Sequence, residues 1–402
     1  MSADAILGTS ARERERLAAC IARHLPAPLV SVFSAEVMCS HLLFDEFVHR
    51  LILSVCAETE LGAAACQWST VDEIVARSGL DPGHASAAVA SMLRHLAARG
   101  VLASAEAGGR FRAERELPLL DPAPVRDEQQ RHDPACLPSY VIAEAAARDY
   151  PAFLRGQREG EDILLAPPRL PLWVAYFSND NRLYALNNRV GAVAVETWMP
   201  RAVGSVLEIG GGCASGTQAL LDHLSAVGRL GDVARYRFTE LVPAFLRRGQ
   251  RIVEERFPGL RGLTFESLDM NRPFGEQGVR PESVSIVYAV NTLHVAHDLS
   301  FTLAEVRRAL EPGGQLILSE CVRPFAGQTL YPEFVFNLMA TFRVPRLHPQ
   351  YRPNGGFLTT GQWTSALEAA GFGDVRVLPD IDSIRHVLPT FYAAALSATR
   401  GS

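Results

Sequence analysis

The chain has 402 residues, of which 48% are hydrophobic and 21% charged, and this composition is typical of a globular protein with room for two domains. Its formal net charge of −5 gives no general attraction to nucleic acid or to an acidic membrane. All 39 basic residues are arginines, which excludes lysine chemistry such as a Schiff base with pyridoxal phosphate or a Walker phosphate loop.

The cysteines and the N-terminus indicate the compartment. The seven cysteines are scattered and none lies in C-x-x-C spacing, which indicates reduced thiols rather than a disulfide framework or a zinc site. The first residues lack the apolar stretch of a signal peptide, and no run approaches the roughly 18 apolar residues of a membrane span. We therefore expect a soluble, cytoplasmic protein with no membrane partner.

The first part of the chain predicts two short helices followed by a β-ribbon. A capping box at 70–73 begins one helix, and Asp81, followed by proline, begins a second helix that ends near Gly100. Two short strands are expected over 101–114, around a pair of glycines. This succession is typical of a winged helix, so we predict a winged-helix dimerisation domain over 1–118.

A winged helix can bind DNA through its second helix, and that alternative is weighed here. The helix expected over 83–99 consists mostly of small residues, with cationic side chains only at Arg94 and Arg99. A helix that recognises DNA needs polar groups to contact bases and a basic surround. We therefore expect a packing or dimerisation surface, and no nucleic-acid partner.

Residues 119–200 are predicted to form a linker and a helical segment on the substrate side. The stretch 121–138 is rich in proline and charged residues, which is typical of a linker or crossover. A helix is expected over 139–157, and an aromatic and amide-rich segment at 173–179 precedes another helix.

From residue 201 to residue 402, strands and helices alternate. Strands are expected at 204–209, 234–240, 283–290, 315–320, 374–378 and 390–398, and helices near 215–226, 243–256, 300–310 and 361–371. With the short apolar stretch 263–268, this alternation predicts an α/β fold with a Rossmann-like, mostly parallel seven-stranded sheet. The last strand follows its predecessor without room for a full crossover helix, so it should run antiparallel at or near an edge.

The most informative motif is the turn after the first of these strands, VLEIGGGCASGT at 206–217. Gly210 and Gly212 fit the fingerprint of a dinucleotide-binding turn, but Ser215 stands where that fingerprint has its third glycine. Glu208, two residues before the glycines, would repel a pyrophosphate and attract a cation. The turn is therefore predicted to bind a positively charged ligand.

Three further strand ends carry polar residues, at the edge where an α/β sheet binds its ligand. Their chemistry fits S-adenosylmethionine. Glu240 can accept hydrogen bonds from both ribose hydroxyls, and Asp269 can accept one from the adenine amino group while Met270 packs on the ring. The acid of the glycine turn suits the cationic methionine end. The predicted cofactor-binding residues are Glu208, Gly210, Gly212, Glu240, Leu241, Asp269, Met270 and Asn291.

Over about 204–323 the chain resembles the class I methyltransferases, and in particular the C-methyltransferase domains of polyketide synthases. The matching stretches are Leu207-Glu208-Ile209-Gly210, Phe238-Thr239-Glu240 with Pro243-Ala244-Phe245-Leu246, Asn291-x-x-His294, and Leu310-Glu311-Pro312-Gly313-Gly314 leading to Glu320. The layout of most of the chain also resembles small-molecule O-methyltransferases, which dimerise through a winged helix. The resemblance implies a homodimeric methyltransferase of natural-product biosynthesis.

Both families place a histidine at the position of His294 and an acid near Glu320. Carried over to this chain, His294 would be the general base, and Glu320 would orient it and balance its charge. Methyl transfer from a sulfonium depends mostly on positioning, and an imidazole can take the proton of a hydroxyl or an acidic C–H group near neutral pH. A helix-capping or core role is the alternative for His294. The preferred target is an activated carbon, with a hydroxyl oxygen as the alternative.

The chain departs from these families in two places. Ala214 replaces a glycine of the first loop, a mild change unless the backbone there needs a positive φ. Plant-type O-methyltransferases carry another acid after a late glycine pair, whereas here the pair 355–356 is followed by Phe357. A second catalytic acid is therefore not expected, which favours carbon as the target.

Residues 321–360 form an insertion that suits a substrate cover, with an apolar helix followed by an arginine-rich loop. The arginines can meet a carboxylate, a phosphopantetheine arm or solvent, so the substrate can be a free small molecule or one tethered to a carrier protein. The predicted substrate residues are Tyr176, Phe177, Tyr184, Asn337 and Arg343.

Three other hypotheses were weighed. A metal site at His294 and His297 with His348 as a third ligand is a weak signal, because Asp298 more simply caps the next helix, so no metal is expected. A rearrangement enzyme that binds the cofactor without transferring its methyl group is disfavoured because the chain retains Glu208, Glu240 and His294. A winged-helix regulator that senses S-adenosylmethionine is disfavoured by the poorly basic second helix.

Overall fold

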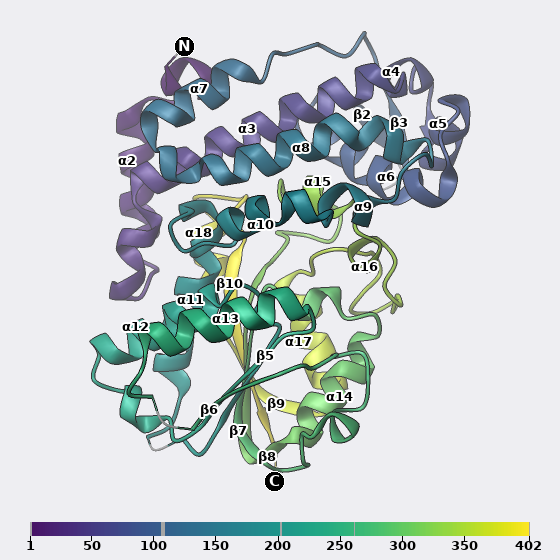
Figure 1. Ribbon diagram of the computed structural model, residues 1–402. Helices are drawn as coiled ribbons and strands as arrows, with labels where there is room; N and C mark the ends of the chain where they lie inside the picture. Colours follow the sequence, from purple (N-terminus) through teal and green to yellow (C-terminus); the bar gives the residue numbers. More distant parts are fainter. Residues whose placement is uncertain (1, 106–108, 202, 261, 402) are drawn as a thin grey trace. The chain divides into compact units, whose positions relative to one another are not determined.

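The structure is a computed structural model of residues 1–402 that describes all of them except 1, 106–108, 202, 261 and 402 (Figure 1). The chain divides into two compact units. Unit 1 comprises Met1–Ala18, Ser34–Tyr176 and Phe325–Val344, and unit 2 comprises Ala19–Phe33, Phe177–Pro324 and Pro345–Ser402. These bounds differ from the three predicted segments 1–118, 119–200 and 201–402, whose status as separate domains stays a prediction.

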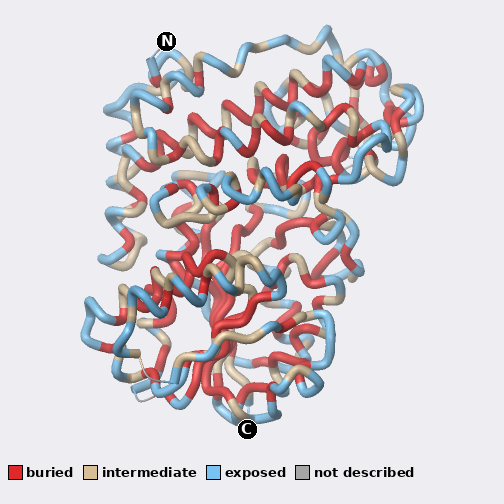
Figure 2. Tube along the Cα trace, in the orientation of Figure 1, coloured by how far each residue is buried: buried red, intermediate tan, exposed pale blue. Residues whose placement is uncertain are grey.

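Unit 1 is mainly helical. The helices that begin in it are α1 (Ala3–Leu7), α2 (Ala11–Ala22), α3 (Ala35–Glu58), α4 (Leu61–Ala64), α5 (Val71–Arg77), α6 (Pro82–Ala98), α7 (Ala123–His132), α8 (Leu137–Leu154), α9 (Gly160–Leu164), α10 (Leu170–Tyr176), α15 (Glu333–Phe336) and α16 (Ala340–Arg343). Its core lies where α3 packs on α8, with the ring of Tyr140 centred 4.9 Å from that of Phe44 and 4.5 Å from that of Phe47. Figure 2 shows the facing sides of both helices as buried.

The helix–helix–ribbon succession predicted near the N-terminus is present. Thr70 and Glu73 form the expected capping box of α5, and the Asp81 side chain accepts a hydrogen bond from the His84 N–H at the start of α6. The strands β1 (Ser69–Thr70), β3 (Arg110–Arg112) and β2 (Ala103–Ala105) form an antiparallel sheet in that order. The glycine pair expected at the ribbon's tip falls partly on 106–108, outside the described residues. The role of this part in dimerisation stays a prediction.

The linker predicted at 121–138 is wrong, because this stretch is helical. The Asp121 side chain accepts a hydrogen bond from the Ala123 N–H, and proline just before the first turn suits a helix start, so α7 forms here. The helix buries Val125 and Gln129 against α3. Its high charge reflects an exposed face, while the buried face is anchored by Val125 and by the hydrogen bond from Gln129 to Ser40.

A buried histidine pair makes unit 1 sensitive to acid. Nδ1 of His49 in α3 lies 3.3 Å from Nε2 of His95 in α6, and burial lowers the pKa of His49 from 6.5 to about 4 and that of His95 to about 3. As the pH falls, the unfolded chain protonates these histidines at a higher pH than the folded protein does. The free energy of unfolding therefore has its full value above pH 6.5 and decreases as the pH falls toward 4. At about 1.4 kcal/mol per pKa unit, the loss is about 3 kcal/mol for His49.

We therefore expect the melting temperature to fall between pH 6.5 and 4 in calorimetry, and to fall less steeply in a His95→Gln variant. An identical pH dependence in the variant would contradict the role of the pair. His386→Gln, at an exposed histidine of unit 2, is the control.

Unit 2 contains the predicted seven-stranded sheet. Its strands are β4 (Val206–Ile209), β5 (Tyr236–Thr239), β6 (Leu263–Glu266), β7 (Val284–Val290), β8 (Leu310–Cys321), β9 (Phe372–Leu378) and β10 (Ala393–Arg400), and its longer helices are α11 (Arg182–Trp198), α12 (Ser215–Ala226), α13 (Pro243–Arg256), α14 (Leu299–Ala309) and α17 (Thr360–Ala369), with the short α18 (Ile381–Arg385). The order is β6-β5-β4-β7-β8-β10-β9.

The sheet topology confirms the predicted fold class. The pairs of β4 with β5 and β7, of β5 with β6 and of β7 with β8 are parallel, and β10 runs antiparallel between β8 and β9. The chain leaves β4 toward β5 and leaves β7 toward β8, so right-handed crossovers place α12 and α13 on one face and α14 on the other (Figure 1). Every residue of β7 is buried, as a central strand covered on both faces requires.

Two smaller expectations have different outcomes. The apolar helix predicted in the insertion corresponds to the short helix α15, which is followed by the short helix α16. Among the described helices none is by itself long and apolar enough to cross a membrane, although a bent pair, Ala27–Phe33 with α3, meets the length and composition of a span.

Candidate active site

The glycine loop joins β4 to α12 at the carboxyl edge of the sheet. Gly210 and Gly212 both have positive φ, +65° and +54°. A Cβ atom at Gly210 would lie 2.5 Å from Cγ2 of Thr292, whereas a Cβ at Gly212 would meet nothing closer than 4.0 Å. A side chain at position 210 would therefore clash with Thr292, whereas Gly212 borders open space.

Ala214 also adopts a positive φ, 65°. Alanine is therefore less favourable than the usual glycine at this position. A left-handed conformation costs a residue with a Cβ about 1–2 kcal/mol. The loop bears this strain at the start of α12, where Ala214 is fully buried.

Glu208 lies within β4 and is 2% exposed. Its Oε2 atom accepts hydrogen bonds from the Thr217 hydroxyl at 2.6 Å and the Tyr236 hydroxyl at 2.8 Å. Burial raises the pKa of Glu208 from 4.5 to about 7, which the two hydroxyls only partly offset. The structure thus gives this carboxyl group internal partners, and its role toward a cationic ligand stays a prediction.

A Glu208→Gln variant should separate the charge from the hydrogen bonds. Since the folded state favours the protonated carboxyl group, the wild-type protein has its full stability below pH 4.5 and loses it as the pH rises through 7. The amide keeps an oxygen acceptor and does not ionise. We expect the free energy of unfolding of Glu208→Gln, measured with urea, to increase by about 3 kcal/mol relative to that of the wild type over this pH range. A constant difference between the two proteins would contradict the raised pKa.

Glu240 directly follows β5, and its side chain contacts the glycine loop. Its Oε2 atom accepts a hydrogen bond from the Gly212 N–H at 2.9 Å, and Oε1 accepts one from the Val242 N–H at 2.7 Å. Each carboxylate oxygen has a further lone pair for a ligand hydroxyl. Leu241, beside it, is 53% exposed, which is unusual for leucine and leaves an apolar surface at the edge of the loop.

The third predicted position lies after β6. The backbone of Asp269 is held by the Gln277 side chain, and its Oδ1 atom accepts a hydrogen bond from the Asn271 N–H at 2.9 Å. The carbonyl of Met270 accepts a hydrogen bond from the Thr302 hydroxyl at 3.0 Å. Both side chains are half-buried, so they remain available to a ligand.

Together these residues fit the donor pattern of S-adenosylmethionine. The space beside Gly212, the carboxylate of Glu240 and the exposed Leu241 lie along one edge of β4 and β5. Two acids at this edge disfavour a phosphate and suit a ligand with hydroxyl and ammonium groups. The residues present therefore fit this cofactor, and their contacts with it stay a prediction.

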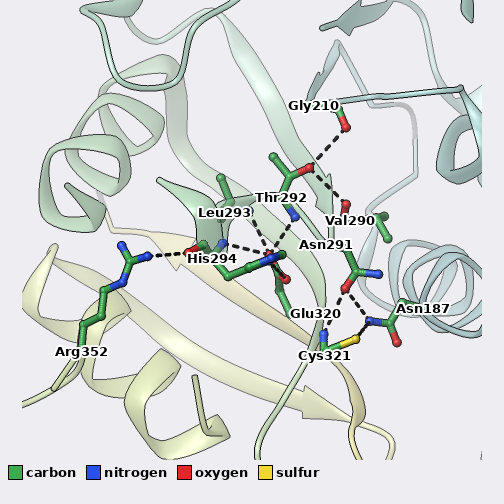
Figure 3. Close-up of polar contacts among 10 residues, drawn as sticks. All are labelled: Asn187, Gly210, Val290, Asn291, Thr292, Leu293, His294, Glu320, Cys321 and Arg352. Atoms are coloured by element: carbon green, nitrogen blue, oxygen red, sulfur yellow. Dashed lines mark hydrogen bonds and ion pairs between the residues drawn. The ribbon is translucent and has the colours of Figure 1, made fainter. Parts of the chain in front are cut away.

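His294 and Glu320 form a buried pair between β7 and β8 (Figure 3). Nδ1 of His294 lies 2.7 Å from Oε2 of Glu320. Oε1 of Glu320 accepts hydrogen bonds from the N–H groups of Thr292 at 3.1 Å, Leu293 at 2.9 Å and His294 at 3.4 Å. Since a carboxylate accepts, Nδ1 is the donor in this contact, and its partner nitrogen Nε2 would carry the free lone pair of a neutral ring.

The turn that carries His294 (hereafter the base turn, residues 291–297) is tied to the glycine loop. The hydroxyl of Thr292 lies 3.3 Å from the carbonyl of Gly210. Asn291 has a positive φ of 48°, which asparagine tolerates better than most residues, and its Oδ1 atom accepts from Asn187 at 2.7 Å and from the Cys321 N–H at 3.1 Å. Asn291 is therefore a strand-end crosslink in this structure, and a direct cofactor contact stays a prediction.

Two residues that hold His294 were not predicted. Phe357 packs its ring 4.6 Å from that of His294, at the place where an acid was considered and not expected. Arg352, which the sequence grouped with possible substrate-facing arginines, is 1% exposed and donates to the carbonyls of His294 and Ala296. No local pattern distinguishes this arginine from its exposed neighbours, so only its burial identifies it.

The predicted substrate residues fall in both units. In unit 2, Phe177 packs on Tyr184 with ring centroids 5.0 Å apart. In unit 1, Tyr176 packs edge-on against Trp173, Arg343 lies over the ring of Phe153, and Asn337 lines a small cavity with His95 and Thr329. Their contact with a substrate stays a prediction.

The structure offers no support for the metal hypothesis. Among the residues that the structure describes, no group of three or more histidine, cysteine, aspartate or glutamate side chains could hold a metal ion. Asp298 instead caps α14 by accepting a hydrogen bond from the Phe301 N–H, and the His348 ring stacks on Tyr351 at 3.8 Å.

Residues 207–316 match the family model described as a methyltransferase domain. Among curated proteins, highly reducing polyketide synthase 2 of Gibberella zeae is 28% identical over 268 residues, or 64% of this chain. The lovastatin diketide synthase lovF of Aspergillus terreus is 34% identical over 203 residues, or 50% of this chain. The chain spans about a tenth of the length of these relatives.

Solved structures share the fold over nearly the whole chain. The CurJ carbon methyltransferase has a TM-score of 0.73 at 21% identity, with 90% of this chain and 92% of that chain covered. The DszA carbon methyltransferase has a TM-score of 0.69 at 23% identity, with 94% and 95% covered. The trans-methyltransferase CalH, solved with SAH, has a TM-score of 0.56 at 19% identity, with 88% and 90% covered.

Proposed function

We propose that this chain, of which residues 207–316 match a methyltransferase domain model, is an S-adenosylmethionine-dependent C-methyltransferase of natural-product biosynthesis. The observation that carries the proposal is the His294–Glu320 pair, buried beside the glycine loop. A histidine oriented by a carboxylate, next to a site with the donor pattern of a sulfonium nucleoside, is equipped to remove a proton where a methyl group is delivered.

The proposed reaction removes a proton from a carbon that lies between two carbonyl groups. Nε2 of His294 accepts this proton, and Glu320 stabilises the resulting imidazolium through Nδ1. The carbanion forms the new carbon–carbon bond. When bound, S-adenosylmethionine supplies the electrophilic methyl group, and the electron pair of the broken carbon–sulfur bond stays on sulfur. The other residues of the site act by holding the reactants in line.

Carbon is favoured over oxygen by what surrounds the base. Phe357 places an aromatic ring, rather than a second carboxylate, against His294. A single acid is sufficient for a substrate whose C–H group is already acidified by two carbonyls. The solved relatives with the higher TM-scores quoted above are described as carbon methyltransferases, which supports the same choice.

The proposed substrate class is a β-carbonyl thioester, either free or tethered to a carrier protein. The polyketide synthases that match this chain are much longer than it, and the chain spans about a tenth of their length. Phe177 and Tyr184, whose rings pack together in unit 2, are the proposed substrate contacts in the unit that carries the glycine loop.

The test uses S-adenosylmethionine labelled with carbon-13 in its methyl group and a β-ketoacyl pantetheine thioester as substrate. We expect one labelled methyl group on the α-carbon, identified by carbon NMR, and one equivalent of S-adenosylhomocysteine. A methyl group on oxygen would replace the proposal by O-methylation, and a converted substrate without S-adenosylhomocysteine would replace it by a rearrangement.

We also propose that the chain acts as a homodimer through its N-terminal winged-helix part. Light scattering after size-exclusion chromatography tests this directly. We expect twice the 43.8 kDa mass of the chain, and the mass of a single chain would contradict the proposal.

A further inference from the structure

Arg352 is among the largest fully buried side chains of the described residues. Its Nη1 atom donates to the carbonyl of Ala296 at 2.6 Å, and Nη2 donates to the carbonyl of His294. Burial lowers the pKa of Arg352 to about 10, which still leaves the guanidinium charged at neutral pH. A buried charge is costly unless it is compensated, and here the two carbonyls accept its hydrogen bonds while the carboxylates of Asp298 and Glu320 favour its charge.

Arg352 lies in a short hairpin that packs beside His294 and Ala296. His348 and Arg352 exchange two backbone hydrogen bonds of 2.9 Å, which close the hairpin. The Arg346 N–H donates to the carbonyl of His297 at 2.7 Å, and the Tyr351 hydroxyl is hydrogen-bonded to Ser300. The hairpin (residues 346–352) is therefore attached to the base turn and to the start of α14 at several points.

Glu320 and Arg352 hold opposite ends of the base turn (Figure 3). The carboxylate accepts from N–H groups at the beginning of the turn, and the guanidinium donates to carbonyl groups at its end. The negative carboxylate thus faces backbone N–H groups, which are the positive ends of the peptide dipoles. The positive guanidinium faces carbonyl groups, which are their negative ends. His297, the last residue of the turn, is also held by backbone hydrogen bonds with Asn271 and Arg346, so the specific contribution of Arg352 is to fix the carbonyl group of His294 itself.

We infer that Arg352 is a positioning residue for His294, which fixes the carbonyl side of the base turn and so the direction in which Nε2 points. Its effect on turnover rests on the proposed function. Its effect on the order of the turn does not, and the two are measured separately. Because the chain re-enters unit 2 at residue 345, the hairpin that carries Arg352 also directly follows the insertion segment of unit 1.

The experiment compares Arg352→Ala and Arg352→Lys with Arg346→Ala in the full chain. Arg346 lies on the same hairpin, but its side chain is 72% exposed and its backbone contact survives the substitution, so it is the matched control. Hydrogen–deuterium exchange of peptides covering the base turn reports its order without a substrate. Binding of S-adenosylhomocysteine by calorimetry shows that the cofactor site is intact.

We expect faster exchange of the base turn in Arg352→Ala, with unchanged S-adenosylhomocysteine affinity. We also expect a fall in kcat of about 100-fold at similar KM, because a displaced base loses rate rather than affinity. Added guanidinium ion, well below unfolding concentrations, should restore part of both properties by filling the vacated space. Arg352→Lys should retain intermediate values, and Arg346→Ala should match the wild type.

Faster exchange with unchanged kcat would overturn the positioning role, as would unchanged exchange in Arg352→Ala or an equal effect of Arg346→Ala. Should Arg352→Ala fail to fold, Arg352→Lys carries the same comparison. If the wild type transfers no methyl group, the proposed function fails, and the exchange data alone decide whether Arg352 orders the turn.

Discussion

Replacing His294 with alanine is expected to lower kcat for methyl transfer about 1000-fold, within the range that a general base contributes. The ring is 5% exposed and paired with Glu320, so it can be removed without disturbing Gly212 or Glu240. S-adenosylhomocysteine should therefore bind the variant as it binds the wild type. Initial rates with labelled S-adenosylmethionine, together with calorimetric binding, measure both quantities.

His297→Ala is the matched control for this prediction. His297 is an exposed histidine three residues further along, and its backbone hydrogen-bonds to Asn271 and Arg346. We expect wild-type turnover from it. An equal loss in both variants would favour the metal hypothesis, because that hypothesis requires both rings, and wild-type turnover in His294→Ala would remove the base assignment.

Glu320→Gln is expected to lower kcat by a similar factor, about 1000-fold, through the tautomer of His294. The amide oxygen can still accept from the three N–H groups of the base turn, so the fold should be retained. The amide nitrogen, however, would face Nδ1. The ring then avoids two opposed donors by moving its proton to Nε2, which can no longer accept a proton from the substrate.

Glu305→Gln is the control for this substitution. Glu305 is 3% exposed and also accepts a backbone hydrogen bond, from the Phe274 N–H at 2.6 Å, but it lies on α14 and has no contact with His294. We expect its turnover to match the wild type. The double variant of His294 and Glu320 should be hardly slower than either single variant, since the two act as one unit. Multiplied losses would indicate that Glu320 acts independently of the base.

Local signals in the sequence predicted the regular elements with accuracy. The bounds expected for the helices at 215–226 and 243–256 agree with those observed, because glycine or proline marks their starts and apolar spacing marks their faces. The same kind of signal failed at α7, where proline and charge were interpreted as a linker. Charge on an exposed helical face and charge in a linker have the same composition.

The roles of the acids were predicted less completely. Glu208 and Glu240 were chosen because they stand at strand ends, and the structure places both beside the glycine loop. It also shows that Glu208 has two hydroxyl partners, Thr217 at the end of the same motif and Tyr236 on the next strand. A spacing rule contains no information about such partners, which is why the internal role of Glu208 was not foreseen.

The sequence by itself determined the mostly parallel sheet, because local periodicity marks its strands and helices, and it placed the polar residues at the strand ends. The pairing of His294 with Glu320 was predicted from the resemblance to known methyltransferases, and the structure brings the two side chains together. Only the tertiary structure decided that Phe357 and Arg352 contact His294, and that the insertion is shared between two units. The physical reason is burial: whether an arginine faces solvent or two backbone carbonyls depends on chain segments that meet only in the folded protein.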